Sequence, residues 1–125
     1  MEINVRNKGS WKQDGFFVGR PSPLSNPFMI TETQTREIVL QRYAEVIKSA
    51  IKNRKKHIIV PLQKLEYHLI ENGKLDLICY CAPKRCHADL IKQILLNKMH
   101  NNYWLVRDCC PTCGHGELKI GIYGL

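Results

Sequence analysis

Leu75-Asp-Leu-Ile-Cys-Tyr-Cys81 is the clearest strand pattern in this chain of 125 residues. A short, mostly apolar run of this kind is typical of a largely buried β-strand. After a turn, apolar residues recur at helical spacing between His87 and Met99, which predicts a helix. A buried strand that leads directly into a helix favours an α/β fold.

The rest of the chain continues this alternation of strands and helices. A capping-box pattern, Thr31 followed three residues later by Gln34, predicts a helix over residues 33–53. Pro61 suits the first position of a second helix, which we expect to end at Glu71, before Asn72-Gly73. The remaining predicted strands are Ile3–Arg6, Gly15–Gly19, Tyr103–Val106 and Leu118–Ile122. We therefore predict an α/β fold, a small single-domain sandwich of a short mixed sheet with about three helices.

Two parts of the chain differ in composition. Residues 1–102 are predicted to form the α/β domain. The whole chain of 125 residues is long enough to bury the surface it needs to fold without further support. Residues 103–125 combine strand patterns with a cysteine cluster. We expect them to form a C-terminal cysteine-knuckle extension that packs on the domain.

The chain carries 19 basic and 11 acidic residues, a formal net charge of +8. This excess favours a nucleotide or nucleic acid as partner, although a soluble basic domain without such a partner has the same composition. No apolar run approaches the roughly 20 residues that cross a bilayer, and the N-terminus lacks a signal-peptide pattern. We therefore expect a cytoplasmic protein that does not bind membranes. A protein partner is also compatible with the sequence, which does not determine the oligomeric state.

A proline-rich loop, Arg20-Pro-Ser-Pro-Leu-Ser-Asn-Pro-Phe28, follows the second predicted strand. Its prolines restrict the backbone, so its polar side chains are ordered before a ligand binds. Arg20 offers a planar set of donors that suits phosphate or carboxylate. The predicted ligand-binding residues are Gly19, Arg20, Ser22 and Asn26. The alternative is a rigid connector whose side chains cap neighbouring backbone groups.

The segment Cys79-Tyr-Cys-Ala-Pro-Lys-Arg-Cys-His87 places three thiols and an imidazole where a strand ends and a helix begins. Strand periodicity puts Cys79 and Cys81 on the same face. Zn²⁺ prefers four tetrahedral ligands of these types. The candidate metal ligands in this segment are Cys79, Cys81, Cys86 and His87.

A catalytic role is the competing interpretation for Cys86 and His87. A helix N-terminus and neighbouring cations, here Lys84 and Arg85, lower the pKa of a thiol. Asp89 could orient His87, or could satisfy backbone donors of the first helical turn. Cys86, His87 and Asp89 are therefore the candidate catalytic residues. The third interpretation is that the cysteines are ordinary core residues.

The segment Cys109-Cys-Pro-Thr-Cys-Gly-His115 is the strongest local metal pattern. Its Pro and Gly favour a tight turn that directs two thiolates at one ion. The candidate Zn²⁺ ligands here are Cys109, Cys110, Cys113 and His115, and a complete site could borrow others from the first cysteine segment. A redox Cys-x-x-Cys pair and free thiols near a chain end are the alternatives.

Two motifs together, Phe17-Val-Gly-Arg-Pro-Ser-Pro-Leu-Ser-Asn-Pro-Phe28 and Cys79-Tyr-Cys-Ala-Pro-Lys-Arg-Cys-His-Ala-Asp89, resemble an uncharacterised family. That family, called domain of unknown function 4326, occurs in bacteria and bacteriophages, and the resemblance covers about residues 3–97. The matching positions are Gly19, Arg20, Asn26, Pro27, Cys79, Cys81, Pro83, Cys86 and His87. Ser25 stands where Gly is common in the family. The resemblance implies no reaction, but it implies that the two motifs form one site.

Three functions fit these observations. The first is a zinc-binding domain with a preorganised pocket for a phosphate-bearing ligand, either a nucleotide or nucleic acid. The second is a zinc- or cysteine-dependent nucleotide-processing enzyme, although His87 does not begin the His-x-Glu motif of zinc deaminases. The third is a small zinc-stabilised protein-interaction factor, of phage origin on the same resemblance.

Overall fold

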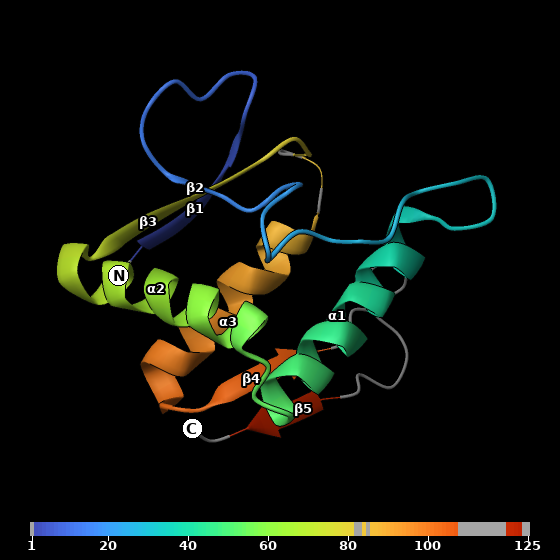
Figure 1. The fold of residues 1–125 in the computed structure, drawn as a ribbon. Coiled ribbons are helices and arrows are strands. Elements are labelled where there is room, and N and C mark those ends of the chain that lie inside the picture. The colour runs from blue at the N-terminus through green and yellow to red at the C-terminus, as the bar shows by residue number, and fades with distance from the viewer. Residues whose placement is uncertain (1, 82–83, 85, 108–119, 124–125) are drawn as a thin grey trace.

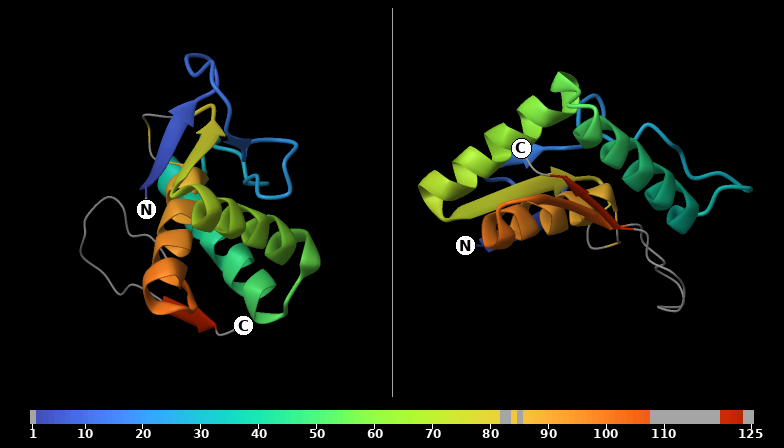
Figure 2. Two further views of the ribbon diagram at one scale, coloured as in Figure 1. Left: turned by 90° about the vertical axis from the view of Figure 1, so that its left-hand side faces the viewer. Right: turned by 90° about the horizontal axis from the view of Figure 1, so that it is seen from below.

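The computed structural model describes residues 2–81, 84, 86–107 and 120–123. Within these residues, a layer of helices lies between a parallel sheet and a two-stranded antiparallel sheet (Figures 1 and 2). The elements in chain order are β1 (Glu2–Asn7), β2 (Phe16–Phe17), α1 (Arg36–Lys52), α2 (Lys56–Asn72), β3 (Lys74–Cys79), α3 (His87–Asn101), β4 (Trp104–Arg107) and β5 (Ile120–Tyr123). The predicted α/β fold with three helices is confirmed.

The first sheet has the strand order β1-β3-β2, with both pairs parallel. Ile3 pairs with Leu75, and Phe17 pairs with Ile78. Neighbouring parallel strands need a long crossover connection, and α1 and α2 supply it between β2 and β3. The antiparallel pair, β4 with β5, forms the second sheet. Parallel and antiparallel pairs therefore lie in two separate sheets.

One hydrophobic core joins the two sheets through the helices. It contains Leu77 from β3, Leu62 from α2, Ile94 from α3 and Trp104 from β4, all with 0% of their surface exposed. The described part of residues 103–125 thus packs on the same core as the rest of the chain. The predicted knuckle at residues 109–115 lies outside the described residues.

Helix α1 begins later than the capping-box pattern predicts. Its N-cap is Thr35, whose side chain accepts a hydrogen bond from the Ile38 N–H at 3.4 Å. Thr31 Oγ1 instead accepts from the Gln34 N–H at 3.1 Å and closes a separate turn before the helix. Two threonines can each cap a turn, and only the second turn continues into a helix.

Helix α2 begins five residues before Pro61, which lies inside the helix and not at its first position. The earlier start lets Ile58 and Ile59 join the buried face with Leu62. Pro61 has no N–H, so it removes one hydrogen bond of the helix, and burial of two isoleucines outweighs that loss. The helix ends at Asn72, one residue later than predicted, and Gly73 closes it in the left-handed conformation at φ 70°.

The described part of the chain contains no helix that is both long and apolar enough to cross a membrane.

Candidate functional site

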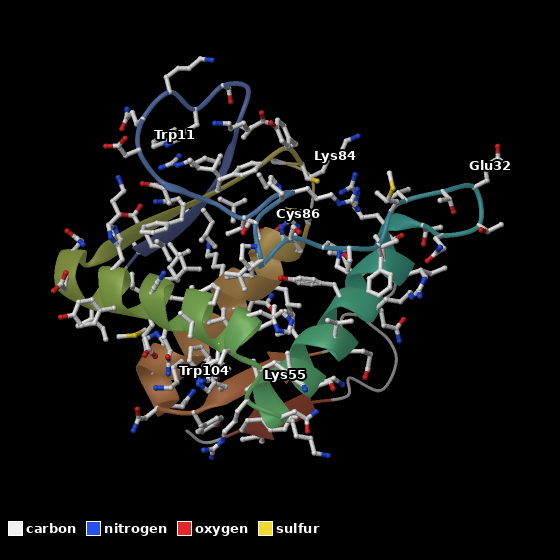
Figure 3. All side chains as sticks on the ribbon, viewed as in Figure 1. Trp11, Glu32, Lys55, Lys84, Cys86 and Trp104 are labelled. Carbon is white, nitrogen blue, oxygen red and sulfur yellow. The ribbon has the colours of Figure 1, made fainter. Side chains whose placement is uncertain are left out.

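The structure brings the two sequence motifs together in one pocket of about 320 Å³. The proline-rich loop contributes Gly19, Arg20 and Asn26, and the cysteine segment contributes Cys81, Cys86 and His87. The loop after β2 passes the first turn of α3 (Figure 1), and Cys86 marks this point in Figure 3. These residues follow the carboxyl ends of β2 and β3, where open α/β sheets generally bind ligands.

His87 connects the two motifs directly. Its Nε2 lies 2.6 Å from the carbonyl oxygen of Val18, next to Gly19. A carbonyl only accepts hydrogen bonds, so Nε2 carries the hydrogen, and Nδ1 of the neutral ring keeps a lone pair. Burial lowers the pKa of His87, and the hydrogen bond to Val18 opposes that shift. A neutral imidazole therefore lines the pocket at pH 7.

Arg20 and Asn26 hold the loop in shape through hydrogen bonds to its backbone. Arg20 Nε and Nη2 donate to the Asn26 carbonyl at 3.2 and 3.1 Å, and Nη2 also donates to the Phe28 carbonyl. The Asn26 side chain donates to the Val39 carbonyl of α1 and accepts from the Phe28 N–H. These hydrogen bonds are the ones that the rigid-connector interpretation of the loop predicts. Both residues nevertheless line the pocket, and Arg20 Nη1 has no hydrogen-bond partner among the described residues.

Ser22 and Asp89 lie near the pocket but stabilise backbone turns. Ser22 Oγ accepts from the Leu24 N–H at 3.2 Å, and Ser22 is not among the residues that line the pocket. Asp89 Oδ2 accepts from the Cys86 N–H at 2.9 Å and so caps α3. The sequence left open whether Asp89 orients His87 or satisfies backbone donors, and this contact corresponds to the second role.

The Cys86 thiol is buried and paired with a second thiol. Its Sγ lies 3.3 Å from Cys79 Sγ. The hydrogen bond with Cys79 and burial raise the pKa of Cys86, and together they outweigh an opposing hydrogen bond from the Ala88 backbone. This direction is opposite to the lowered pKa expected for a thiol at a helix N-terminus near cations. Cys86 is a protonated thiol at neutral pH, which disfavours its predicted role as a nucleophile.

The described residues contain no group of three or more His, Cys, Asp or Glu side chains arranged to hold a metal ion. Cys79 and Cys86 are adjacent, but the Nε2 of His87 is directed at Val18 instead of the thiols. The other predicted Zn²⁺ ligands, Cys109, Cys110, Cys113 and His115, lie outside the described residues. Zinc binding therefore stays a prediction from sequence.

The walls of the pocket are formed by residues that the motif analysis did not single out. They are mainly apolar and aromatic, with one further arginine: Phe28, Met29, Ile30, Arg36, Val39, Leu40 and Tyr80. Met29 and Tyr80 are 62% and 66% exposed, so a large apolar surface faces the opening. Phe28 and Tyr80 stand inside the two motifs, but nothing in the sequence shows that they face the same cavity.

A helical layer, a short parallel sheet and a pocket at the carboxyl ends of two of its strands define a small α/β domain. The chain belongs to the family described as Domain of unknown function (DUF4326), which it matches over residues 3–97. The matched range includes both motifs and ends inside α3, before β4 and β5. No curated protein and no solved structure matches the chain.

Proposed function

We propose that the pocket binds a nucleotide, with the base against the apolar wall and the phosphate near the two arginines. The observation that carries this proposal is the composition of the lining. Arg20 and Arg36 share a cavity with Phe28, Tyr80 and the imidazole of His87. A ligand with a flat apolar part and an anionic part matches both halves of such a pocket.

Arginine suits the anionic part of this ligand. Its guanidinium group donates two parallel hydrogen bonds to phosphate and stays charged at every physiological pH. Arg20 is already fixed by the Asn26 and Phe28 carbonyls, so little conformational entropy is lost when Nη1 binds an oxygen. Arg36 in the first turn of α1 lines the same cavity and adds a second positive charge.

The other side of the pocket suits a base. Tyr80 and Phe28 offer aromatic rings for stacking, which is worth about 1–3 kcal/mol per base. His87 offers the lone pair of Nδ1 to an N–H group on the edge of a base. An imidazole kept neutral by burial accepts this bond throughout the physiological pH range.

Isothermal titration calorimetry with ribo- and deoxyribonucleoside monophosphates tests the proposal. We expect one saturable site, and binding of the matching nucleosides should be at least tenfold weaker, about 1.4 kcal/mol. Arg36→Gln should weaken nucleotide binding by about 10- to 100-fold, as expected for a lost charged hydrogen bond. Arg54→Gln, in the exposed link between α1 and α2, is the matched control. Equal binding of nucleosides and nucleotides, or no binding of either, would overturn the proposal.

We keep two further proposals that rest on the sequence. One is that the cysteine knuckle at residues 109–115 binds Zn²⁺. The ion would then stabilise the fold, or the protein would be a zinc-stabilised protein-interaction factor. The other is that the protein works in a reducing cytoplasm, that of the host if a phage encodes the chain. Cys81 and Cys86 form no disulfide, which is compatible with such a compartment. A cysteine-dependent reaction is less well supported, because the raised pKa of Cys86 disfavours the thiolate.

A further inference from the structure

We propose that the outer face of the parallel sheet, together with the segment between β1 and β2 that packs on it, continues the pocket as a binding surface for single-stranded nucleic acid, so that the bound nucleotide is one unit of a longer strand. This inference rests on the nucleotide site proposed above. We call the surface the sheet-face track and define it by Arg6, Lys8, Trp11, Lys12, Phe17 and Tyr80.

The track lies on the side of the sheet away from the helices. Leu75 and Leu77 of β3 point into the core, so strand alternation directs Asp76 to the opposite face. Arg6 of β1 reaches Asp76 on that face, with Nε 3.1 Å from Oδ1. The segment between β1 and β2 runs along the same side, and Trp11 stands there in Figure 3.

Aromatic side chains connect this face to the pocket. Tyr80 lines the pocket and meets Phe17 edge to face, with ring centroids 5.5 Å apart. The Lys8 ammonium lies 5.6 Å from the centroid of Phe17. The Arg6 guanidinium lies 4.1 Å from the centroid of Trp11. Phe17 and Trp11 thus each have a cation over the ring, and Phe17 also contacts Tyr80 at the pocket. Aromatic rings with neighbouring cations are the groups that single-strand-binding surfaces use.

The charge of the track favours a phosphate backbone. Asp76 lies within ion-pair distance of both Arg6 and Lys74, so it balances part of their charge. Lys8 and Lys12 are exposed and form no ion pair with an acidic side chain among the described residues. Phosphates that bind these lysines release their condensed counterions, which favours binding. The unpaired bases of a single strand remain available for stacking on Tyr80. A duplex would hide its bases from these rings.

Fluorescence anisotropy and calorimetry on the full chain can separate the track from the pocket. The probes are thymidine and uridine monophosphate, the hexanucleotides of thymidylate and uridylate, and a duplex of the same length. We expect each hexanucleotide to bind at least tenfold more tightly than its mononucleotide and more tightly than the duplex. A preference between the two hexanucleotides would show whether the natural strand is DNA or RNA.

The double variant Lys8→Gln/Lys12→Gln tests the residues. It should leave mononucleotide binding unchanged and reduce hexanucleotide affinity by about tenfold. The slope of log K against log salt is negative, and it should become less steep by about 1.4 because two phosphate contacts are lost. Lys55→Gln/Lys56→Gln removes the same charge at the start of α2, on the far side of the molecule from Trp11, and should change neither affinity (Figure 3).

The outcomes distinguish the two proposals. Equal affinities for mononucleotide and hexanucleotide, or an equal affinity for the duplex and the hexanucleotide, would contradict the track. Either result would be compatible with the pocket proposal. Hexanucleotide binding that depends on Lys8 and Lys12, without any mononucleotide binding, would contradict the pocket proposal and leave the track. If both double variants weaken binding equally, general charge attraction explains the affinity and the track is wrong.

Discussion

The Nε2 of His87 lies 2.6 Å from the carbonyl oxygen of Val18, although 69 positions separate the two residues in the chain. This bond holds the proline-rich loop against the first turn of α3. It also fixes which ring nitrogen carries the hydrogen, and thereby what the imidazole presents to the pocket.

His87 should make the stability of the protein depend on pH. Its pKa is lowered in the folded state, so below the unfolded value of about 6.5 the unfolded chain binds a proton that the folded chain resists. Stability is therefore fully present above pH 6.5 and falls as the pH decreases. Urea denaturation between pH 5 and 8 should show this slope, and His87→Gln should flatten it. The exposed His57→Gln is the control, and an unchanged slope in His87→Gln would contradict the assignment.

Tyr43→Phe should destabilise the protein without changing its shape. The buried Tyr43 hydroxyl donates to the Leu24 carbonyl at 2.6 Å and ties the proline-rich loop to α1. Its removal leaves that carbonyl unpaired, which costs about 1–3 kcal/mol. The free energy of unfolding from chemical denaturation measures the loss. Tyr67→Phe, at a side chain 63% exposed, should be close to neutral.

Gly19→Ala should disturb the pocket directly. A Cβ at this position would lie 2.7 Å from Cζ of Phe17, closer than such atoms approach, so the ring must move. We expect a loss of about 1–3 kcal/mol in unfolding free energy, typical of overpacking, and weaker nucleotide binding. In Gly9→Ala the added carbon meets only the Asn7 side chain, at 3.2 Å. The two variants should therefore differ in both measurements, and equal behaviour would contradict the packing argument.

Alkylation rates should rank the cysteines of the second motif. Cys81 is half-buried at the pocket, whereas Cys86 is buried and its pKa is raised. With iodoacetamide at pH 7.5, Cys81 should react faster than Cys86. Trypsin separates the two residues by cutting after Lys84 and Arg85, and mass spectrometry then reads each peptide. Faster labelling of Cys86 would indicate an activated thiolate and would revive the enzyme hypothesis.

Native mass spectrometry of the reduced protein tests zinc binding. If the C-terminal cysteine pattern forms a knuckle, the untreated protein should carry zinc, and Cys113→Ser should lose it. Tyr123→Phe, in β5, leaves every predicted ligand intact and is the control. A folded, reduced wild-type protein without metal would remove the zinc hypothesis.

Local sequence patterns predicted the elements better than their boundaries. The apolar run at residues 75–81 was predicted to be a strand, and the structure has β3 at Lys74–Cys79. The helix predicted between His87 and Met99 is α3, which continues to Asn101. Thr31 and Thr35 are chemically equivalent caps, and only the packing of α1 selects the second. Pro61 lies inside α2 because burial of Ile58 and Ile59 outweighs one missing hydrogen bond, a balance that propensity alone does not contain.

The candidate site was also predicted only in part, because local sequence patterns do not contain the long-range packing that completes it. Gly19, Arg20 and Asn26 share a pocket with Cys81, Cys86 and His87, as the paired motifs implied. The roles of Ser22 and Asp89 depended on whether each side chain reaches a backbone N–H, which only the folded geometry decides. The walls around Tyr80 come from distant segments, so no local pattern indicates them.

Trp104 belongs to the hydrophobic core although it lies outside the residues that match the family. The family match stops at residue 97, yet this indole, entirely enclosed, fills the space beneath the helices. Removing a Trp of about 200 Å² would forfeit about 5 kcal/mol of transfer free energy, comparable with the whole stability of many small domains. A version trimmed to the matched range should aggregate when expressed.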